Sequence, residues 1–364
     1  MRLVALPWSL WALLSISIPS ISASRSENAR IDPTFSRSEA EWGNPPPPPD
    51  PLPVPPPRPL VIWHGLGDQY ASPGMLDFIG LIKQVHPGIF IHSVRLSDEP
   101  SSDQRAGWFG NVNEQIAQVA EQISSIPELE SGFDAMGFSQ GGQFLRAYVE
   151  RYNNPPVRNL ITFGSQHMGI SDLPGCKPTD FLCRAAKNAA GAGVYTEWAQ
   201  HHLVQAQYFR DHKHYDSYLR SNRFLADINN EAREEPDPDN RASKQALKNT
   251  TYATNLASLD NFVMVLFNQD QTVIPKESAW FGSYEIPSDD DGTTDPPAII
   301  HMRRQPLYKE DWIGLRTLDE QEKVFMVVCN GEHMRLEEAS SEVSVPRPVN
   351  LLTRSAYFGG EMNR

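Results

Sequence analysis

The pattern that most constrains this fold is a series of short apolar runs that alternate with segments of helical spacing. The expected strands lie at residues 60–63, 90–96, 133–138 and 159–163. The expected helices lie at residues 75–85, 111–123 and 143–152. Parallel strands need long crossover connections, which helices usually supply. The alternation therefore predicts an α/β fold with a mainly parallel central sheet that is covered on both faces.

The alternation stops after about residue 169, and strands are expected again only at residues 262–267 and 324–329. The stretch between has a mostly helical pattern. Its expected apolar anchors are Tyr195, Trp198, Leu203, Tyr208, Phe209, Tyr218, Leu219, Phe224 and Leu225. Such a block predicts an inserted cap or lid domain. The expected parts are a first core segment at residues 59–169, a helical insertion at 170–259, a second core segment at 260–350 and a tail at 351–364.

The first 23 residues have the pattern of a cleaved secretory signal. Arg2 is followed by an apolar run to Ile18 and then by small residues up to Ala23. The alternative is a membrane anchor, but the run is shorter than the ~20 residues that span a bilayer. No other stretch is apolar enough to span one. We therefore predict removal of residues 1–23 and a mature protein in an oxidising lumen, where disulfides persist.

Residues 24–58 are first polar and then rich in proline. This composition predicts a disordered linker with polyproline II character. Binding to an SH3-like or WW-like module is an alternative, but those modules are cytosolic and a secreted chain would not meet them. The folded domain is expected to begin near Pro59.

Charge and composition exclude several classes of protein. The chain has 32 basic and 45 acidic residues, a net charge of −13, which disfavours binding to nucleic acids and anionic lipids. Its 40% hydrophobic and 21% charged residues are typical of a globular protein. The 3 cysteines exclude both a small disulfide-rich scaffold and a zinc site built on paired Cys-x-x-Cys units.

A Gly-x-Ser-x-Gly motif stands directly between an expected strand and an expected helix, with Ser139 at its centre. The motif alone also occurs in ordinary glycine-rich turns. Its position favours a nucleophile elbow, a tight turn that exposes the serine hydroxyl above the sheet. Gly137 and Gly141 suit this turn because side chains at these positions would collide across it. We therefore predict that Ser139 is a catalytic nucleophile.

A serine nucleophile needs a base and a group that orients the base, and in this arrangement the acid precedes the histidine along the chain. Asp270 follows one of the two later strands, and His333 follows the other. They are the predicted orienting acid and general base. His167 is a rival base because it also follows a strand, but it precedes the acid. Glu332 is expected to be a solvated neighbour of the base.

The negative charge that develops during acyl transfer needs backbone N–H donors. One is expected from Gln140, which directly follows the nucleophile. The other is expected from the glycine-containing loop at residues 64–68, after the first strand. For His64, which opens this loop, a structural role is favoured over a catalytic one.

The remaining polar clusters favour ordinary surface positions. The insertion contains four histidines that we expect to be solvated rather than to bind a metal. They are His201, His202, His212 and His214. Asn249 begins an Asn-Thr-Thr sequence, which is an acceptor site for N-glycosylation. No metal ion or organic cofactor is implied.

Six sequence blocks together resemble the palmitoyl-protein thioesterase family, the lysosomal enzymes that remove fatty acyl groups from proteins. They are VIWHGLGD at residues 61–68, GFSQGG at 137–142, GSQHMG at 164–169, FLADIN at 224–229, WFG at 280–282 and GEH at 331–333. The blocks follow one another in the family's order from about Pro59 to Leu336. The proline-rich segment is foreign to the family pattern.

The resemblance implies an α/β-hydrolase fold and a catalytic triad of Ser139, Asp270 and His333. It places the oxyanion donors at the backbone of Leu66 and Gln140. Leu66 stands where a methionine is usual in the family, a change that a backbone donor should tolerate. The helical insertion is expected to form a lipid groove over the sheet.

The resemblance also places a disulfide between Cys176 and Cys183, in a loop-rich stretch that follows a strand. This leaves Cys329 as a buried thiol on the strand that leads to His333.

The activity implied is hydrolysis of the thioester between a long-chain fatty acyl group and a protein cysteine, through an acyl-enzyme. An oxygen-ester hydrolase or lipase is the alternative within the same fold. A lipid-binding protein without activity is a further alternative, which the intact set of three catalytic residue types disfavours. The expected partners are S-acylated proteins or peptides and acyl thioesters. The expected location is the lysosome or vacuole, or outside the cell.

Overall fold

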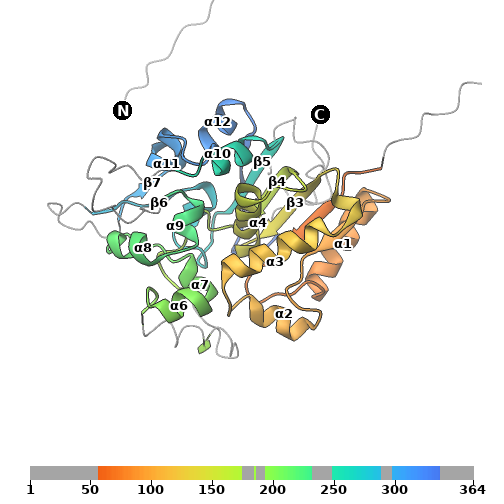
Figure 1. The fold of residues 1–364 in the computed structure, drawn as a ribbon, viewed down its shortest axis with the longest axis horizontal. Helices are drawn as coiled ribbons and strands as arrows, with labels where there is room; N and C mark the ends of the chain where they lie inside the picture. The colour runs from red at the N-terminus through yellow and green to blue at the C-terminus, as the bar shows by residue number, and fades with distance from the viewer. Residues whose placement is uncertain (1–55, 174–183, 186–192, 232–247, 288–296, 337–364) are drawn as a thin grey trace, which may run out of the picture. The chain divides into compact units, whose positions relative to one another are not determined.

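The computed structural model describes residues 56–173, 184–185, 193–231, 248–287 and 297–336. Within them, one sheet of six strands forms the centre of the fold (Figure 1). Its strands, in spatial order, are β2 (Ile91–Ser93), β1 (Leu60–Trp63), β3 (Phe133–Phe138), β4 (Val157–Phe163), β5 (Asn261–Phe267) and β8 (Val324–Cys329). Every neighbouring pair is parallel. The predicted parallel sheet is confirmed.

Burial along the strands follows their position in the sheet. All six residues of β3 are buried, since β3 lies inside the sheet and both of its faces are covered. On the edge strand β8, by contrast, Phe325, Val327 and Cys329 are buried, whereas Met326 and Val328 are exposed. The continuous apolar run and the alternating one are the patterns expected of covered and half-covered strands.

Each face of the sheet has its own hydrophobic core. The four helices of the first core segment are α1 (Pro73–Val85), α2 (Pro100–Ala106), α3 (Val112–Ser124) and α4 (Gln140–Arg151). Ile82 of α1 packs with Leu60 and Ile62 of β1 on one face. Helices α3 and α4 pack on the other face, with Val61 and Trp63 of β1 (Figure 1). Successive residues of β1 therefore enter opposite cores, as the two-residue period of a strand requires.

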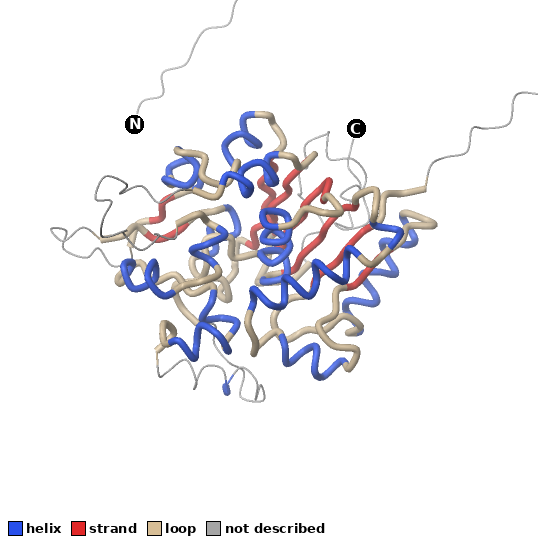
Figure 2. The backbone as a smooth tube through the Cα atoms, in the orientation of Figure 1, coloured by secondary structure: helices blue, strands red, loops and turns tan. Residues whose placement is uncertain are grey.

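The regular elements in the described part of residues 170–259 are short helices (Figure 2). They are α6 (Glu197–His202), α7 (Val204–Gln207), α8 (Tyr215–Ser221), α9 (Leu225–Ile228) and α10 (Thr250–Ala257). Most of the expected apolar anchors are buried or half-buried. The prediction for Trp198 was wrong, because this residue is 52% exposed. Its indole stacks on the His202 imidazole, with the ring centroids 5.1 Å apart. None of the helices described is long and apolar enough to cross a bilayer.

Further short elements connect β5 to β8. They are the 3₁₀-helices η2 (Lys276–Trp280) and η3 (Met302–Arg304), the strand pair β6 (Ser283–Tyr284) and β7 (Ile299–Ile300), and the helices α11 (Pro306–Lys309) and α12 (Leu315–Glu320). The strands β6 and β7 pair antiparallel. The remaining 3₁₀-helix, η1 (Pro127–Leu129), precedes β3.

The two largest errors in predicted boundaries, of three residues each, have a local cause. Strand β2 is shorter than expected because the Leu96 N–H bonds the Asp103 carboxylate at 2.7 Å rather than a neighbouring strand. Helix α4 begins three residues earlier than expected because the turn at Ser139 leads into it directly. Helix α2 was missed. Its signal was Pro100 at the first helical position, with Glu99 as the capping residue.

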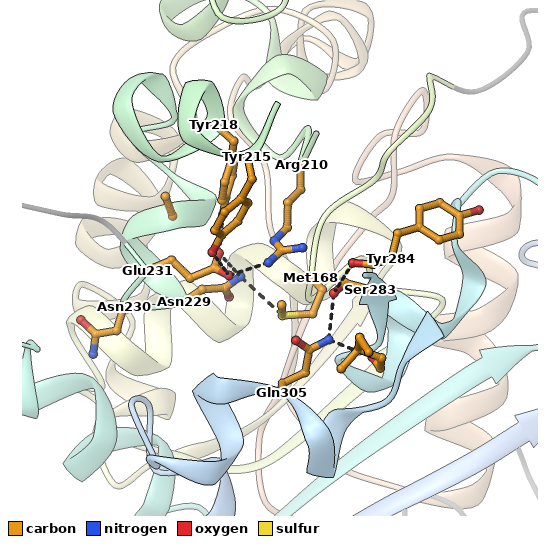
Figure 3. Close-up of polar contacts among 12 residues, drawn as sticks. Met168, Arg210, Tyr215, Tyr218, Asn229, Asn230, Glu231, Ser283, Tyr284 and Gln305 are labelled. Atoms are coloured by element: carbon orange, nitrogen blue, oxygen red, sulfur yellow. Dashed lines mark hydrogen bonds and ion pairs between the residues drawn. The ribbon is translucent and has the colours of Figure 1, made fainter. Parts of the chain in front are cut away.

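A buried polar network holds the insertion together (Figure 3). The Glu231 carboxylate accepts hydrogen bonds from Arg210 at 2.9 Å, Tyr218 at 2.6 Å and Tyr215 at 3.1 Å. The Asn229 amide lies between Glu231 and the sulfur of Met168, which belongs to the core (Figure 3). The network therefore links the insertion to the segment that follows β4.

Candidate active site

Ser139 lies at a strained turn between β3 and α4. Its φ is 51° and its ψ is −122°, backbone angles that residues other than glycine rarely adopt. A Cβ on Gly137 would lie 2.2 Å from the Gly142 Cα, and a Cβ on Gly141 would lie 2.4 Å from the Trp63 carbonyl oxygen. These positions must therefore be glycine. The turn has the geometry of a nucleophile elbow.

Asp270 follows β5 and has its carboxylate fixed from both sides. Its side chain is only 2% exposed. The Oδ1 atom accepts hydrogen bonds from the N–H groups of Thr272 at 2.8 Å and Val273 at 3.0 Å. The Oδ2 atom lies 2.6 Å from the Nδ1 atom of His333. The backbone turn therefore holds the carboxylate toward the imidazole.

His333 connects the aspartate to the serine. Its Nε2 atom lies 3.1 Å from the Ser139 Oγ. With the Nδ1 proton donated to Asp270, the Nε2 atom is free to accept the serine proton. The strands β5 and β8 are neighbours, and the loops after them are joined by hydrogen bonds from the Gly331 N–H to Asn268 and from the Gln269 N–H to Gly331. The structure thus joins the side chains of Asp270, His333 and Ser139 by two consecutive hydrogen bonds.

The loop after β1 lies against the elbow. A Cβ on Gly65 would be 3.3 Å from both the Phe138 carbonyl oxygen and the Ser139 Cβ, so Gly65 allows close approach. Within the described residues, the backbone N–H groups of Leu66 and Gln140 have no hydrogen-bond acceptor. The two predicted oxyanion donors therefore come from the loop after β1 and from the first residue of α4, which meet beside Ser139.

His64 has a structural partner. It is 1% exposed, and its Nε2 atom lies 3.1 Å from the Asp103 Oδ2. Burial raises the pKa of Asp103, but hydrogen bonding and attraction from His64 and two backbone N–H groups outweigh this effect and leave the pKa below its usual value. This pair anchors the start of the loop to α2, in agreement with the structural role expected for His64.

His167, the rival base, is fully buried away from the line of three residues. Its ring stacks on Phe281 at 4.8 Å, and its Nε2 atom lies 3.1 Å from the Thr162 hydroxyl. Burial lowers the pKa of His167 well below its usual value, and the nearby Arg146 lowers it further. The structure does not bring His167 to Ser139. Glu332 is exposed, as expected.

One expectation about the histidines of the insertion was wrong. His212 is 8% exposed and packs against Tyr284 at 4.9 Å, because the insertion folds back onto the segment around β6. His201, His202 and Trp198 line a surface cavity of about 520 Å³. Ser139, Asp270 and His333 do not line this cavity. In the part of the chain that the structure describes, no group of three or more His, Cys, Asp or Glu side chains could hold a metal ion.

The other predicted sites are covered only in part. Cys176 and Cys183 lie outside the described residues, so their pairing stays a prediction. Cys329 is fully buried on β8, as predicted. Asn249 is exposed at the first turn of α10, where its Oδ1 accepts from the Thr251 N–H at 3.1 Å. Its glycosylation stays a prediction.

Sequence reasoning missed the residues that surround the loops at the site. Asp103 and Gln104 come from α2, and Tyr208 comes from the insertion. No motif marks these residues, because their contacts depend on how α2 and the insertion pack on the core.

A family model and several known proteins are similar to this chain over most of its length. The family model described as palmitoyl protein thioesterase matches residues 59–333. The chain belongs to the palmitoyl protein thioesterase family. It is 38% identical to Palmitoyl-protein thioesterase 1 of Caenorhabditis elegans, over 76% of this chain and 87% of that protein. It is 33% identical to Palmitoyl-protein thioesterase 3 of Dictyostelium discoideum, over 76% of this chain and 85% of that protein.

A more distant relative of this thioesterase family is Lysosomal thioesterase PPT2 of Rattus norvegicus. It is 27% identical, over 72% of this chain and 76% of that protein. Membership of the family agrees with the α/β-hydrolase fold.

Proposed function

We propose that the protein hydrolyses the thioester bond between a long-chain fatty acyl group and a protein cysteine. The observation that carries this proposal is the line Asp270–His333–Ser139, with separations of 2.6 Å and 3.1 Å, in a chain of the palmitoyl protein thioesterase family. Ser139 is the nucleophile, His333 the general base and Asp270 the group that orients the base.

The first half of the reaction transfers the acyl group to the enzyme. The Ser139 Oγ attacks the thioester carbon while its proton passes to the His333 Nε2. The negative charge that develops on the carbonyl oxygen is stabilised by the N–H groups of Leu66 and Gln140. The carbon–sulfur bond then breaks, the cysteine sulfur takes the proton from His333, and the acyl group remains on Ser139.

The second half releases the fatty acid. Water attacks the acyl carbon and gives a proton to His333, and the bond to the Ser139 Oγ breaks as that oxygen regains the proton. Asp270 stabilises the imidazolium that forms in each half. No metal or cofactor takes part in this scheme.

The acyl chain is proposed to supply most of the binding energy, at roughly 0.8 kcal/mol for each buried methylene. A groove between the insertion and the sheet would hold it. A thiol of pKa about 8.5 is a good leaving group. Because the acyl chain supplies most of the binding energy, the demands on the peptide part of the substrate are expected to be loose.

The test compares three peptides that differ only in the acyl linkage: a palmitoylated cysteine, its palmitoylated serine analogue and an acetylated cysteine. We expect the palmitoyl thioester to be cleaved fastest and Ser139→Ala to abolish turnover. Preference for the oxygen ester would identify a lipase instead. Equal rates on the acetyl and palmitoyl thioesters would refute the groove, and full activity in Ser139→Ala would refute the mechanism.

The secretory pathway, and within it the lysosome or a vacuole, is the proposed location, supported by the relative named as a lysosomal thioesterase. Release from the cell is the alternative. This location requires removal of residues 1–23 and permits both the Cys176–Cys183 disulfide and a glycan on Asn249. Mass spectrometry of the protein from eukaryotic cells, without reduction, should find all three modifications. An alkylated Cys176 in the folded protein would refute the disulfide.

A further inference from the structure

The two proposed oxyanion donors are backbone groups, so their aim depends on what holds the loops that carry them. A backbone N–H has no rotamer of its own, and preorganised donors act only if they point at the developing charge. The inference below rests on the proposed function and concerns the residues that fix these two donors.

The end of α2 holds the loop that carries the Leu66 N–H. The Gln104 Nε2 donates a hydrogen bond to the Gly67 carbonyl oxygen at 2.6 Å. Gly67 has a φ of +76°, and a Cβ there would lie 3.4 Å from the Trp108 indole, so Trp108 packs directly on this turn. Gln104 and Trp108 therefore fix the residue that follows Leu66 on two sides.

The same segment holds the second donor. The Gln140 side chain is buried, and its Nε2 donates to the Gly107 carbonyl oxygen at 3.1 Å. Its Oε1 accepts a hydrogen bond from the Tyr208 hydroxyl at 3.2 Å. Both ends of the side-chain amide are therefore held, and they tether Gln140 at the start of α4.

The insertion is hydrogen-bonded to residues 108–110, which follow α2. The Val204 N–H bonds the Trp108 carbonyl oxygen at 3.1 Å, and the Gly110 N–H bonds the His202 carbonyl oxygen at 3.0 Å. Residues 104–110 thus lie between the insertion and both oxyanion loops. Gly107 is where they meet, since a Cβ there would lie 3.2 Å from the Gln140 Nε2 and 3.7 Å from the Gly67 nitrogen.

We propose that residues 104–108 form a bracket that aligns both oxyanion donors, with Gln104 and Tyr208 as positioning residues that touch no reacting atom. Through Tyr208, the insertion then has a part in transition-state stabilisation as well as in binding the acyl chain. The distinguishing property of such residues is an effect on kcat without an equal effect on substrate binding.

The test uses Gln104→Met and Tyr208→Phe, which remove one hydrogen bond each and keep the side-chain volume. Loss of a whole oxyanion donor lowers kcat about 10²–10³-fold, so misalignment is expected to lower kcat about tenfold, with KM within about twofold of the wild type. A long-chain alkyl trifluoromethyl ketone, which adds to Ser139 and places an oxyanion in the hole, should inhibit more weakly by the same factor. Inhibition by palmitate should not change.

Two further variants separate positioning from stability. Gln104→Lys restores a donor of similar reach and should recover most of kcat. Gln118→Met is the matched control, because Gln118 also donates to a backbone carbonyl, that of Leu96 at 3.1 Å, but on the exposed side of α3. It should leave kcat unchanged. Thermal unfolding of each variant shows whether it is folded at the assay temperature.

Unchanged kcat in Gln104→Met and Tyr208→Phe, or a loss confined to KM, would overturn the bracket. Equal inhibition of wild type and variants by the ketone would also overturn it. These results would leave the proposed function intact, because that function fails if Ser139→Ala stays active, or if the palmitoyl thioester is not cleaved in preference to the oxygen ester.

Discussion

At the scale of single residues, Asp270 has the most demanding position in the site. Its two oxygens serve different partners: Oδ1 accepts from two backbone N–H groups, and Oδ2 faces the imidazole of His333. The backbone bonds to Oδ1 hold the carboxylate in place, with Oδ2 aimed at the imidazole. The carboxylate in turn selects the imidazole tautomer that leaves Nε2 free for Ser139.

Asp270→Asn should therefore lower kcat by about 10³–10⁴-fold, because the amide can stabilise the wrong tautomer of His333 and cannot balance the imidazolium. The fold should remain, since the amide oxygen can still accept from the Thr272 and Val273 N–H groups. Steady-state kinetics and circular dichroism check the two parts. Activity within tenfold of the wild type would contradict the role assigned to Asp270.

A second residue-scale prediction concerns Glu150, which is fully buried on α4 with its Oε1 3.3 Å from an Arg146 nitrogen. Burial raises the pKa of Glu150 from 4.5 to about 8, against the attraction of Arg146. The folded state thus holds this proton more tightly than the unfolded state. The contribution of Glu150 to stability is full below pH 4.5 and is lost as the pH rises toward 8.

Glu150→Gln imitates the protonated form. The unfolding temperature of Glu150→Gln, compared with that of the wild type at the same pH, should therefore rise as the pH increases from 5 to 8. This window lies roughly between the unfolded and folded pKa values of Glu150. Thermal unfolding of both proteins at several pH values measures this difference. Glu121→Gln, an exposed change on α3, is the control and should show a constant difference. A constant difference for Glu150→Gln as well would refute the argument.

At the scale of elements, the turn after β4 limits the space around the base. Gly164 has a φ of +54°, and a Cβ there would lie 3.1 Å from the His333 Cε1 and 2.8 Å from the Met334 methyl group. The Phe267 ring closes another side, with its centroid 6.1 Å from that of the imidazole. Three strand ends therefore confine His333, because parallel strands end at the same edge of the sheet.

Gly164→Ala should displace the imidazole and lower kcat, by up to about 10²-fold for a shift near 1 Å. It should also cost roughly 1–2 kcal/mol of stability, because alanine is strained in the left-handed region. Gly88→Ala is the matched control: its φ is +82°, but no atom lies within 4 Å of the added Cβ. It should lose similar stability and keep full activity. Equal activity in both variants would show that Gly164 does not confine His333.

At the scale of the whole molecule, a buried ion pair holds the insertion together, and the Asn229 amide beside it reaches Met168 of the core. The Glu231 carboxylate is the common acceptor for Arg210, Tyr215 and Tyr218, and the side chains of Glu231 and Arg210 are each 4% exposed (Figure 3). Burial disfavours its charged form, but the hydrogen bond and attraction from Arg210 leave the pKa of Glu231 below its usual value. Glu231 therefore remains ionised and paired with Arg210 although both side chains are buried.

Glu231→Gln should destabilise the protein by about 3–5 kcal/mol, because it leaves Arg210 buried without an opposite charge. The control is Glu320→Gln, which breaks the Arg316–Glu320 pair of 3.8 Å on the surface. That change should cost less than about 1 kcal/mol. Chemical denaturation at neutral pH measures both. A loss for Glu231→Gln as small as that of the control would show that the network adds little to stability.

Much of the fold was predictable because its signals are local. The strand β3 was predicted with its observed bounds, since a buried parallel strand is a continuous apolar run. Helix α2 was missed because only its cap and proline mark it. The burial of His212 could not be predicted, since it depends on the approach of Tyr284, 72 residues further along the chain.

The sequence by itself indicated the turn at Ser139, because the steric limit at Gly137 is set by Gly142 within the same turn. The limit at Gly141 is set by the Trp63 carbonyl oxygen on β1, which only the tertiary structure brings there. The sequence also suggested Asp270 and His333 by their order along the chain. Only the tertiary structure decided that the His333 Nε2 lies 3.1 Å from a serine 194 residues away. Likewise, only packing placed Gln104 and Tyr208 around the two oxyanion loops. Such contacts have no sequence period, because they arise where separate elements meet.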